Sequence, residues 1–146
     1  MVSRRIVIGG GTALVAVAAV VAIAPGGAEG LGSLSVGEAH SAAEAGDVLL
    51  VDIRRPDEWA ATGVPASGVA IDMRRPDLAE AILAARAGPD QPIAIICARG
   101  VRSRRVSTAL IDAGIGPIID VPEGMLGSLA GPGWLKSGLP VKDPPA

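Results

Sequence analysis

Residues 92–103 read PIAIICARGVRS, and this stretch decides the fold. The continuous apolar run Ile93–Ile96 is typical of a fully buried strand. Cys97 follows directly, and the helical spacing of apolar residues over 103–113, which stops at Gly114, predicts a helix. The stretch therefore predicts a strand, a tight loop that begins with a cysteine, and a helix.

The same alternation of strands and helices continues on both sides of this stretch. Each expected strand is an apolar run, and each expected helix shows apolar residues at helical spacing or a capping signal at its start. Such alternation in a chain of one-domain length predicts an α/β fold, with a small parallel sheet and helices on both faces. The expected strands are residues 48–53, 69–71, 92–96 and 117–121, and the expected helices are residues 35–46, 56–60, 76–87 and 103–113.

The composition excludes several classes of function. The 146 residues include one Cys and one His, so no intramolecular disulfide can form, and the several Cys or His ligands of a zinc site are missing. A formal net charge of −2 and only two aromatic residues, both Trp, argue against nucleic-acid binding, which favours a basic surface and stacking side chains. We expect no metal and no organic cofactor.

Residues 1–28 have the plan of an export signal or of an N-terminal membrane anchor. Two arginines precede the uncharged, mostly apolar residues 6–24, and small residues follow. Cleavage after Ala28 would release the domain, whereas an uncleaved segment would attach it to the membrane through residues 6–24. Both outcomes predict an exported, periplasmic or extracytoplasmic domain. Residues 3–8 resemble a short twin-arginine signal, so the general and the twin-arginine export routes stay open.

Cys97 is the candidate catalytic residue because it lies at the carboxyl end of a predicted strand, where α/β sheets place their sites. The backbone N–H groups of the loop, together with the positive end of the following helix, would surround its sulfur and stabilise a thiolate. Gly100 lets the backbone curl where a β-carbon would obstruct it. Arg102 is expected to bind the anionic end of a substrate with its forked guanidinium.

The loop sequence CARGVRS, residues 97–103, resembles the active-site loop of single-domain rhodaneses, a Cys-x-x-Gly-x-Arg-Ser pattern. Four further segments resemble other blocks of that family in the same order. The likeness covers residues 33–142, between an expected linker at 29–32 and a tail at 143–146. The four segments are VDIR with PDEW (51–59), TGVPAS (62–67), EGM (123–125) and WLKSGLPV (134–141).

The resemblance implies a rhodanese-type sulfurtransferase that carries sulfane sulfur as a persulfide on Cys97. The implied donor is a small anionic sulfur compound such as thiosulfate, and the implied acceptor is a thiol, cyanide or a sulfur-carrier protein. The alternative is a non-catalytic or sulfur-carrier rhodanese module that acts with a protein partner. The residues implied in substrate binding are Ala98, Arg99, Gly100, Val101, Arg102 and Ser103.

Loop length argues against phosphatases and arsenate reductases of related fold. Those enzymes use a Cys-x5-Arg loop, whereas Cys97 and Arg102 are separated by one residue fewer, and Ser103 stands at the longer spacing. A tighter ring suits a single sulfur atom better than a phosphate-sized group.

Other polar residues have structural and functional interpretations. Arg104 and Arg105 either steer oxyanions toward the thiolate or form the solvated face of a helix. Asp52, Arg54 and Glu58 are expected to form one structural ion-pair set. Residues 72–74 (DMR) follow a strand end and are candidates for lining the crevice. His40 is expected to be a plain surface residue, and Trp59 and Trp134 are expected in the core or at its rim.

Overall fold

The computed structural model describes residues 31–146. The expected leader, residues 1–28, and half of the expected linker at 29–32 lie outside the described residues, so the export and anchoring predictions remain predictions. Within residues 31–146, every helix is too short or too polar to cross a membrane.

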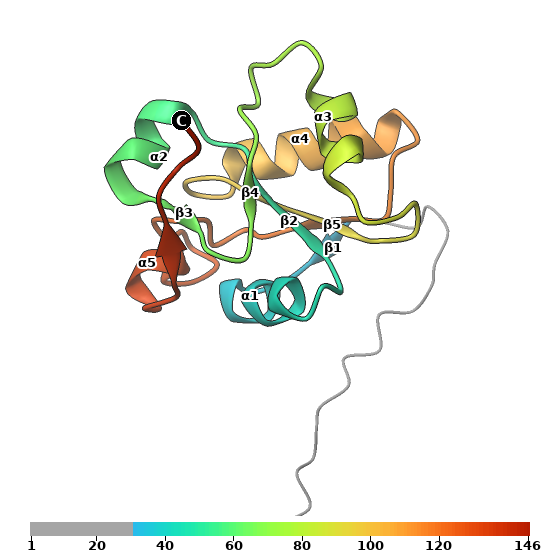
Figure 1. Ribbon diagram of the computed structural model, residues 1–146. Coiled ribbons are helices and arrows are strands. Elements are labelled where there is room, and N and C mark those ends of the chain that lie inside the picture. The colour runs from blue at the N-terminus through green and yellow to red at the C-terminus, as the bar shows by residue number, and fades with distance from the viewer. Residues whose placement is uncertain (1–30) are drawn as a thin grey trace, which may run out of the picture.

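The elements follow the predicted alternation of strands and helices (Figure 1). The helices are α1 (Val36–Glu44), α2 (Pro56–Thr62), α3 (Leu78–Ala85), α4 (Val101–Asp112) and α5 (Gly133–Lys136). The strands are β1 (Gly32–Ser33), β2 (Leu49–Asp52), β3 (Val64–Pro65), β4 (Val69–Ala70), β5 (Ile93–Ile96), β6 (Ile118–Asp120) and β7 (Val141–Lys142).

A parallel five-stranded sheet organises the molecule. Its strand order is β1-β6-β5-β2-β4, so β5 lies in the centre between β6 and β2. Every pair in this sheet is parallel, and Ile95 of β5 is paired with Val51 on one side and with Asp120 on the other. A separate antiparallel pair joins β3 to β7 and ties the C-terminal segment to the rest of the chain. The predicted α/β fold with a parallel sheet is confirmed.

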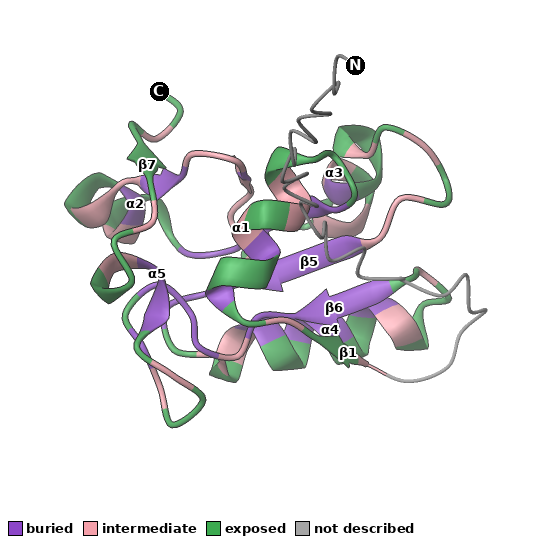
Figure 2. Ribbon diagram, turned by 90° about the horizontal axis from the view of Figure 1, so that it is seen from below, coloured by how far each residue is buried: buried purple, intermediate pink, exposed green. Residues whose placement is uncertain are grey.

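Helices cover both faces of the sheet, and the strand residues alternate between them (Figure 2). Ala94 and Ile96 pack in the cluster that contains residues of α1 and α5, whereas Ile93 and Ile95 pack in the cluster that contains residues of α3 and α4. A central parallel strand buried on both sides needs apolar residues at successive positions. That requirement explains why β5 is a continuous apolar run.

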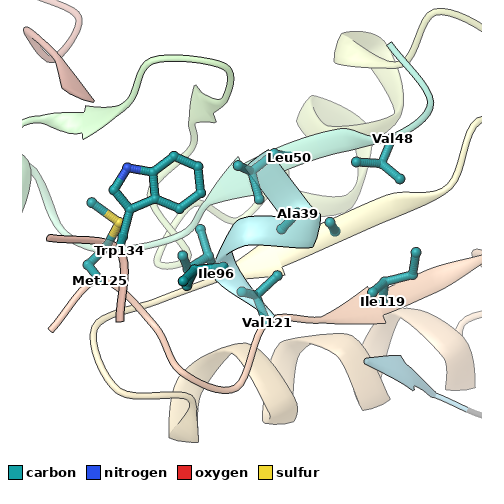
Figure 3. Close-up of a cluster of buried hydrophobic side chains, with 10 residues drawn as sticks. Ala39, Val48, Leu50, Ile96, Ile119, Val121, Met125 and Trp134 are labelled. Atoms are coloured by element: carbon teal, nitrogen blue, oxygen red, sulfur yellow. The ribbon is translucent and has the colours of Figure 1, made fainter. Parts of the chain in front are cut away.

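Trp134 anchors the first of these clusters (Figure 3). Its ring is fully buried beside Met125 and Ile96, and its indole N–H donates to the Pro140 carbonyl at 3.0 Å. Replacing a buried aromatic side chain by Ala typically costs about 3–5 kcal/mol. The short helix α5 therefore holds the C-terminal segment against the sheet, and the expected core position of this tryptophan is confirmed. Trp59 is also buried.

The structure differs from the sequence-based expectation at short elements and at several helix boundaries, since α2 ends at Thr62 and α3 spans only Leu78–Ala85. The two-residue strands β1, β3 and β7 and the four-residue α5 were not predicted, because elements this short carry no periodic pattern. Gly32, at the end of the expected linker, already pairs with Ile119 at the sheet edge. Helix α4 begins at Val101, two residues before the expected start at Ser103.

Candidate active site

Cys97 follows the last residue of the central strand β5, at the carboxyl edge of the sheet. Its side chain packs on the α3–α4 face and is 1% exposed. This position is the crevice where parallel α/β sheets hold their ligands. The burial means that reagents must approach the sulfur through the loop that surrounds it.

The loop after Cys97 turns its backbone toward the sulfur. The Gly100 N–H donates to Cys97 Sγ with a nitrogen–sulfur distance of 3.2 Å. Gly100 is the residue before the first turn of α4, and its φ of +84° lies in the left-handed region that favours glycine. Because α4 starts directly at Val101, the positive end of this helix faces the sulfur, as the sequence predicted.

A second loop, residues 122–126, fixes the shape of the first. The Met125 N–H donates to the Cys97 carbonyl and the Leu126 N–H donates to the Ala98 carbonyl, both at 2.9 Å. A β-carbon on Gly100 would overlap the Pro122 carbonyl, and one on Gly124 would overlap the Ala98 carbonyl. The two loops therefore interlock, and only glycine fits at both contact points.

Arg102 points at a carboxylate of the protein rather than at an empty site. Its two terminal nitrogens donate to the two oxygens of Glu58, at 2.6 and 2.8 Å. The side chains of Arg102 and Glu58 are 26% and 20% exposed. Glu58 thus accepts a forked pair of hydrogen bonds from this guanidinium, and the expected binding of a substrate anion by Arg102 stays a prediction.

This ion pair shifts the titration of both partners. Hydrogen bonds from Arg102 are the main reason that the pKa of Glu58 falls to about 2, with further lowering from the Arg55 backbone N–H. The same hydrogen bonds raise the pKa of Arg102, and the charge of Cys97 adds to that effect. Glu58 is therefore a carboxylate at neutral pH, and Arg102 is the guanidinium bound to it.

Asp52 and Arg54 form a separate pair at the end of β2, so the expected three-residue set is split. Their closest oxygen and nitrogen atoms are 2.7 Å apart, and both side chains are buried. Arg54 also donates to the Thr62 hydroxyl at 2.9 Å and to the Gly63 carbonyl at 2.8 Å. Arg54 donates to the backbone carbonyl of Glu58 and not to its carboxylate, because the Glu58 carboxylate is bound to Arg102.

The remaining loop residues take different positions. Ala98 is buried, and the buried Ser103 hydroxyl donates to the Gly100 carbonyl at 3.1 Å. Arg99 is exposed and donates to the Gly127 carbonyl at 3.2 Å. Val101 is 68% exposed at the start of α4. The loop thus brings together a buried sulfur, the Gly100 N–H that donates to it, and two cations.

A buried carboxyl lies behind α4 and was not predicted to be important. Asp120 ends β6, and burial raises the pKa of its carboxyl. Its Oδ1 atom and the hydroxyl of buried Ser107 have no hydrogen-bond partner among residues 31–146. The sequence carries one signal, since Asp120 interrupts an apolar strand at its carboxyl end.

Three further predicted residues can now be placed. His40 is half-buried, with its Nδ1 atom 3.2 Å from the Ser67 hydroxyl and its ring edge-on to Trp134, so the expectation of a plain surface residue is wrong. Helix α1, which carries His40, is exposed to solvent on one side only. Asp72 and Arg74 bind each other at 2.6 Å, so the charges expected to line the crevice satisfy each other at the surface.

The arginines after the loop face solvent. Arg104 and Arg105 lie on the exposed side of α4, in agreement with the interpretation of a solvated helix face. Residues 31–146 also contain no cluster of three or more His, Cys, Asp or Glu side chains that could hold a metal ion.

Comparison with known proteins identifies the class to which this fold and loop belong. The family model of the rhodanese-like domain matches residues 35–128, so the chain belongs to the rhodanese family. This match includes β2, β5, the Cys97 loop and the whole of the interlocking second loop. The search of curated proteins gave no match.

Solved structures of several rhodanese-related proteins share the fold. A polysulfide-sulfur transferase homodimer from Wolinella succinogenes is 28% identical with a TM-score of 0.60, and the match covers 77% of this chain and 79% of that one. A rhodanese-related protein from Thermoplasma volcanium is 26% identical with a TM-score of 0.57, covering 76% and 97%. A thiosulfate sulfurtransferase from Pseudomonas aeruginosa is 22% identical with a TM-score of 0.61, covering 80% and 21%. The last likeness shows the fold alone.

Proposed function

We propose that this protein is a sulfurtransferase that carries sulfane sulfur as a persulfide on Cys97. The observation that carries the proposal is the Gly100 N–H donated to the Cys97 sulfur at the N-terminus of α4. A hydrogen bond and a helix terminus both favour negative charge on that atom. The sulfurtransferase relative at 28% identity supports the same chemistry.

The loading step uses a small anionic donor such as thiosulfate. The Cys97 thiolate attacks the outer sulfur of thiosulfate, a new sulfur–sulfur bond forms, and the donor's own sulfur–sulfur bond breaks. Sulfite leaves with the bonding electron pair as SO₃²⁻, and the transferred sulfur keeps its negative charge, so Cys97 is left as a persulfide anion. The inward N–H groups of the loop stabilise that charge much as an oxyanion hole does.

Arg102 and Glu58 shape the electrostatics of this step. The negative charge of Glu58 holds the guanidinium in place through two hydrogen bonds. Arg102 keeps donors beyond those two, because guanidinium carries five N–H groups. It can therefore attract an anionic donor toward the loop without leaving Glu58.

The test is loading and turnover of the full chain beside Cys97→Ser and Arg75→Gln. We expect wild type to gain one sulfur atom by mass spectrometry after thiosulfate treatment, and to turn over thiosulfate with cyanide. Cys97→Ser should do neither, while Arg75→Gln, which removes an exposed charge paired only with Asp77, should match wild type. Absence of loading with both thiosulfate and polysulfide in wild type would overturn the proposal.

The carrier alternative is supported by an apolar side chain beside the loop. Val101 is 68% exposed at the start of α4, and an exposed apolar residue beside a reactive group is typical of protein contact surfaces. A pure carrier would load one sulfur on Cys97 but release none to cyanide or to small thiols. The same experiment therefore separates the two functions.

A further inference from the structure

A group of buried polar side chains lies between α4 and β6, and the loading step described above does not use it. Asp120, the last residue of β6, is 2% exposed, and Ser103 and Ser107 of α4 are fully buried. Asp120 Oδ1 and the Ser107 hydroxyl have no hydrogen-bond partner among residues 31–146. Buried polar groups in proteins are nearly always hydrogen-bonded, so this incomplete set needs a physical reason.

Ser103 connects the group to the cysteine loop. Its hydroxyl donates to the Gly100 carbonyl at 3.1 Å, and the Arg104 N–H donates to the same carbonyl at 3.2 Å. The N–H of Gly100 in turn donates to Cys97 Sγ at 3.2 Å. The two residues that hold the carbonyl of Gly100 therefore help to fix the direction of its N–H, and a change at Ser103 reaches the sulfur through a single residue.

The same two residues of α4 also act on the Asp120 carboxyl. Burial raises the pKa of Asp120, and it outweighs the Ser103 hydroxyl, the Arg104 charge and the Val121 N–H, which all lower that pKa. The strands on either side of β6 are β1 and β5, and neither carries a charged side chain. Cys97, directly after β5, is the titratable group at the end of the neighbouring strand. Asp120 and the thiol are thus linked by Ser103 and Gly100.

The single hydrogen of the Ser103 hydroxyl has two acceptors to serve, because a serine hydroxyl is one donor with two lone pairs. Protonated Asp120 can donate to the Ser103 oxygen, which leaves the Ser103 hydrogen on the Gly100 carbonyl, where the structure has it. Ionised Asp120 has no hydrogen to give and competes for that of Ser103. Hydrogen bonds to a charged acceptor are about twice as strong as neutral ones, so ionisation weakens the hold on Gly100.

We propose that Asp120 is a positioning residue of the Cys97 loop, whose neutral form keeps the Gly100 N–H on the sulfur and whose ionised form loosens that contact through Ser103. The negative charge adds to the effect, because an anion behind the first turn of α4 offsets part of the positive helix end that favours a thiolate. Cys97 is therefore less reactive when Asp120 is ionised. The inference describes the thiol, and it rests on the proposed function for its consequence, a pH-dependent rate of sulfur loading.

The first test measures the reactivity of the thiol against pH. Cys97 is the one cysteine of the chain, so the reaction of the full chain with dipyridyl disulfide reports on it alone. Asp120→Asn carries no charge and can donate to Ser103 as the protonated acid does. We expect it to react as fast as wild type at about pH 4, and roughly threefold faster or more at about pH 7, where Asp120 is ionised in wild type.

The matched control for this test is Asp112→Asn, which removes an exposed carboxylate at the other end of α4. It should follow wild type at every pH. A ratio of Asp120→Asn to wild type that stays constant with pH, whatever its size, overturns the inference, because a merely structural role of Asp120 would not follow its titration.

The second test asks whether the effect passes through Ser103 and Gly100. In a Ser103→Ala background, Asp120→Asn should lose most of its effect on the rate at about pH 7, because the shared hydrogen is gone. In wild type, the amide signal of Gly100 should shift with the titration of the Asp120 carboxyl, and in Asp120→Asn it should not. An effect that persists in full without the Ser103 hydroxyl overturns the positioning role. A Gly100 amide that does not respond to Asp120 also overturns it, even if Ser103→Ala fails to fold.

Both tests use the thiol without any sulfur donor, so they separate this inference from the proposed function. If loading from thiosulfate and from polysulfide fails while the reactivity and the Gly100 amide follow Asp120, the proposed function falls and the inference stands. If loading succeeds and neither readout follows Asp120, the proposed function stands and the inference falls.

Discussion

Two carboxylate–guanidinium pairs lie near the carboxyl edge of the sheet, and they serve different ends. Asp52 and Arg54 are 2.7 Å apart with side chains 0% and 1% exposed, whereas Glu58 and Arg102 are 2.6 Å apart and 20% and 26% exposed. The distances are nearly the same. The two pairs differ in solvent exposure, and this difference decides whether a pair mainly stabilises the fold or can also interact with a ligand.

The buried pair is a structural connection between β2 and α2. Arg54 gives hydrogen bonds to Asp52, to Thr62 and to the Gly63 carbonyl, so its donors are taken up inside the protein. Burial of two charges is costly and is offset only when such partners are complete. The half-buried pair joins α2 to α4 and keeps contact with solvent, so an incoming anion can interact with Arg102.

The largest expected effect is on the buried pair. Arg54→Ala leaves Asp52 as a buried carboxylate without its partner, so we expect a loss of about 3–5 kcal/mol in the free energy of unfolding. Urea denaturation of the full chain measures it. Arg75→Ala is the control, because it breaks a solvent-exposed pair with Asp77 and should cost less than about 1 kcal/mol. Equal losses in the two variants would contradict the distinction drawn from burial.

Arg102→Ala is expected to cost less stability, and its cost should depend on pH. Pairing lowers the pKa of Glu58 from 4.5 to about 2 in the folded protein, so the pair stabilises the fold above pH 4.5 and is lost as pH falls toward 2. We expect a deficit of about 1–2 kcal/mol at pH 7 that shrinks across that window, together with a roughly tenfold lower kcat/KM for thiosulfate. Urea denaturation at several pH values and steady-state kinetics measure the two effects. A deficit that stays constant down to pH 2 would argue against the pair as its source.

Asp120 sharpens the comparison because it is a buried carboxyl without an arginine partner. Burial raises its pKa, so the folded protein loses stability as pH rises from about 3.8 through the raised value. Asp120→Asn removes that charge, and we expect it to stabilise the protein at pH 7 by about 0.5–1 kcal/mol, with little gain at about pH 3. Thermal denaturation at the two pH values measures the effect, with the exposed Asp77→Asn as the comparison variant. Destabilisation at pH 7 would show that Asp120 has a partner after all.

The sequence predicted the parts of the fold that rest on local patterns. Strand β5 is a continuous apolar run, β2 and β6 are apolar up to a final Asp, and α1 begins with the capping box formed by Ser35 and Glu38. Helix α4 starts earlier than expected because Gly100 adopts a positive φ and lets the first turn form directly after the loop. The sequence shows that residue 100 is a glycine and can adopt a positive φ. Whether it does so depends on its close packing against Pro122, which the sequence alone does not reveal.

The candidate site could be predicted only in part, for a similar reason. Cys97 and the inward N–H groups follow from one continuous strand–loop–helix segment. The partner of Arg102 does not, because Glu58 is separated from it by 44 residues and is brought near only by the packing of α2 against the sheet edge. A surface hollow lined by Arg99 and Lys136 could not be predicted either, because Lys136 belongs to α5, which is four residues long and has no periodic signature.

The depth of Cys97 in its loop has a consequence for the selectivity of sulfur transfer. A persulfide offers two electrophilic sulfurs, and attack on the inner one would release hydrogen sulfide and trap the chain as a mixed disulfide. Cys97 is 1% exposed, while a second sulfur extends about 2 Å beyond it. An acceptor approaching through the loop therefore meets the outer sulfur first. For the persulfide that we propose on Cys97, the fold would therefore cover the inner sulfur and leave the outer sulfur accessible, which would favour productive transfer over the dead-end reaction.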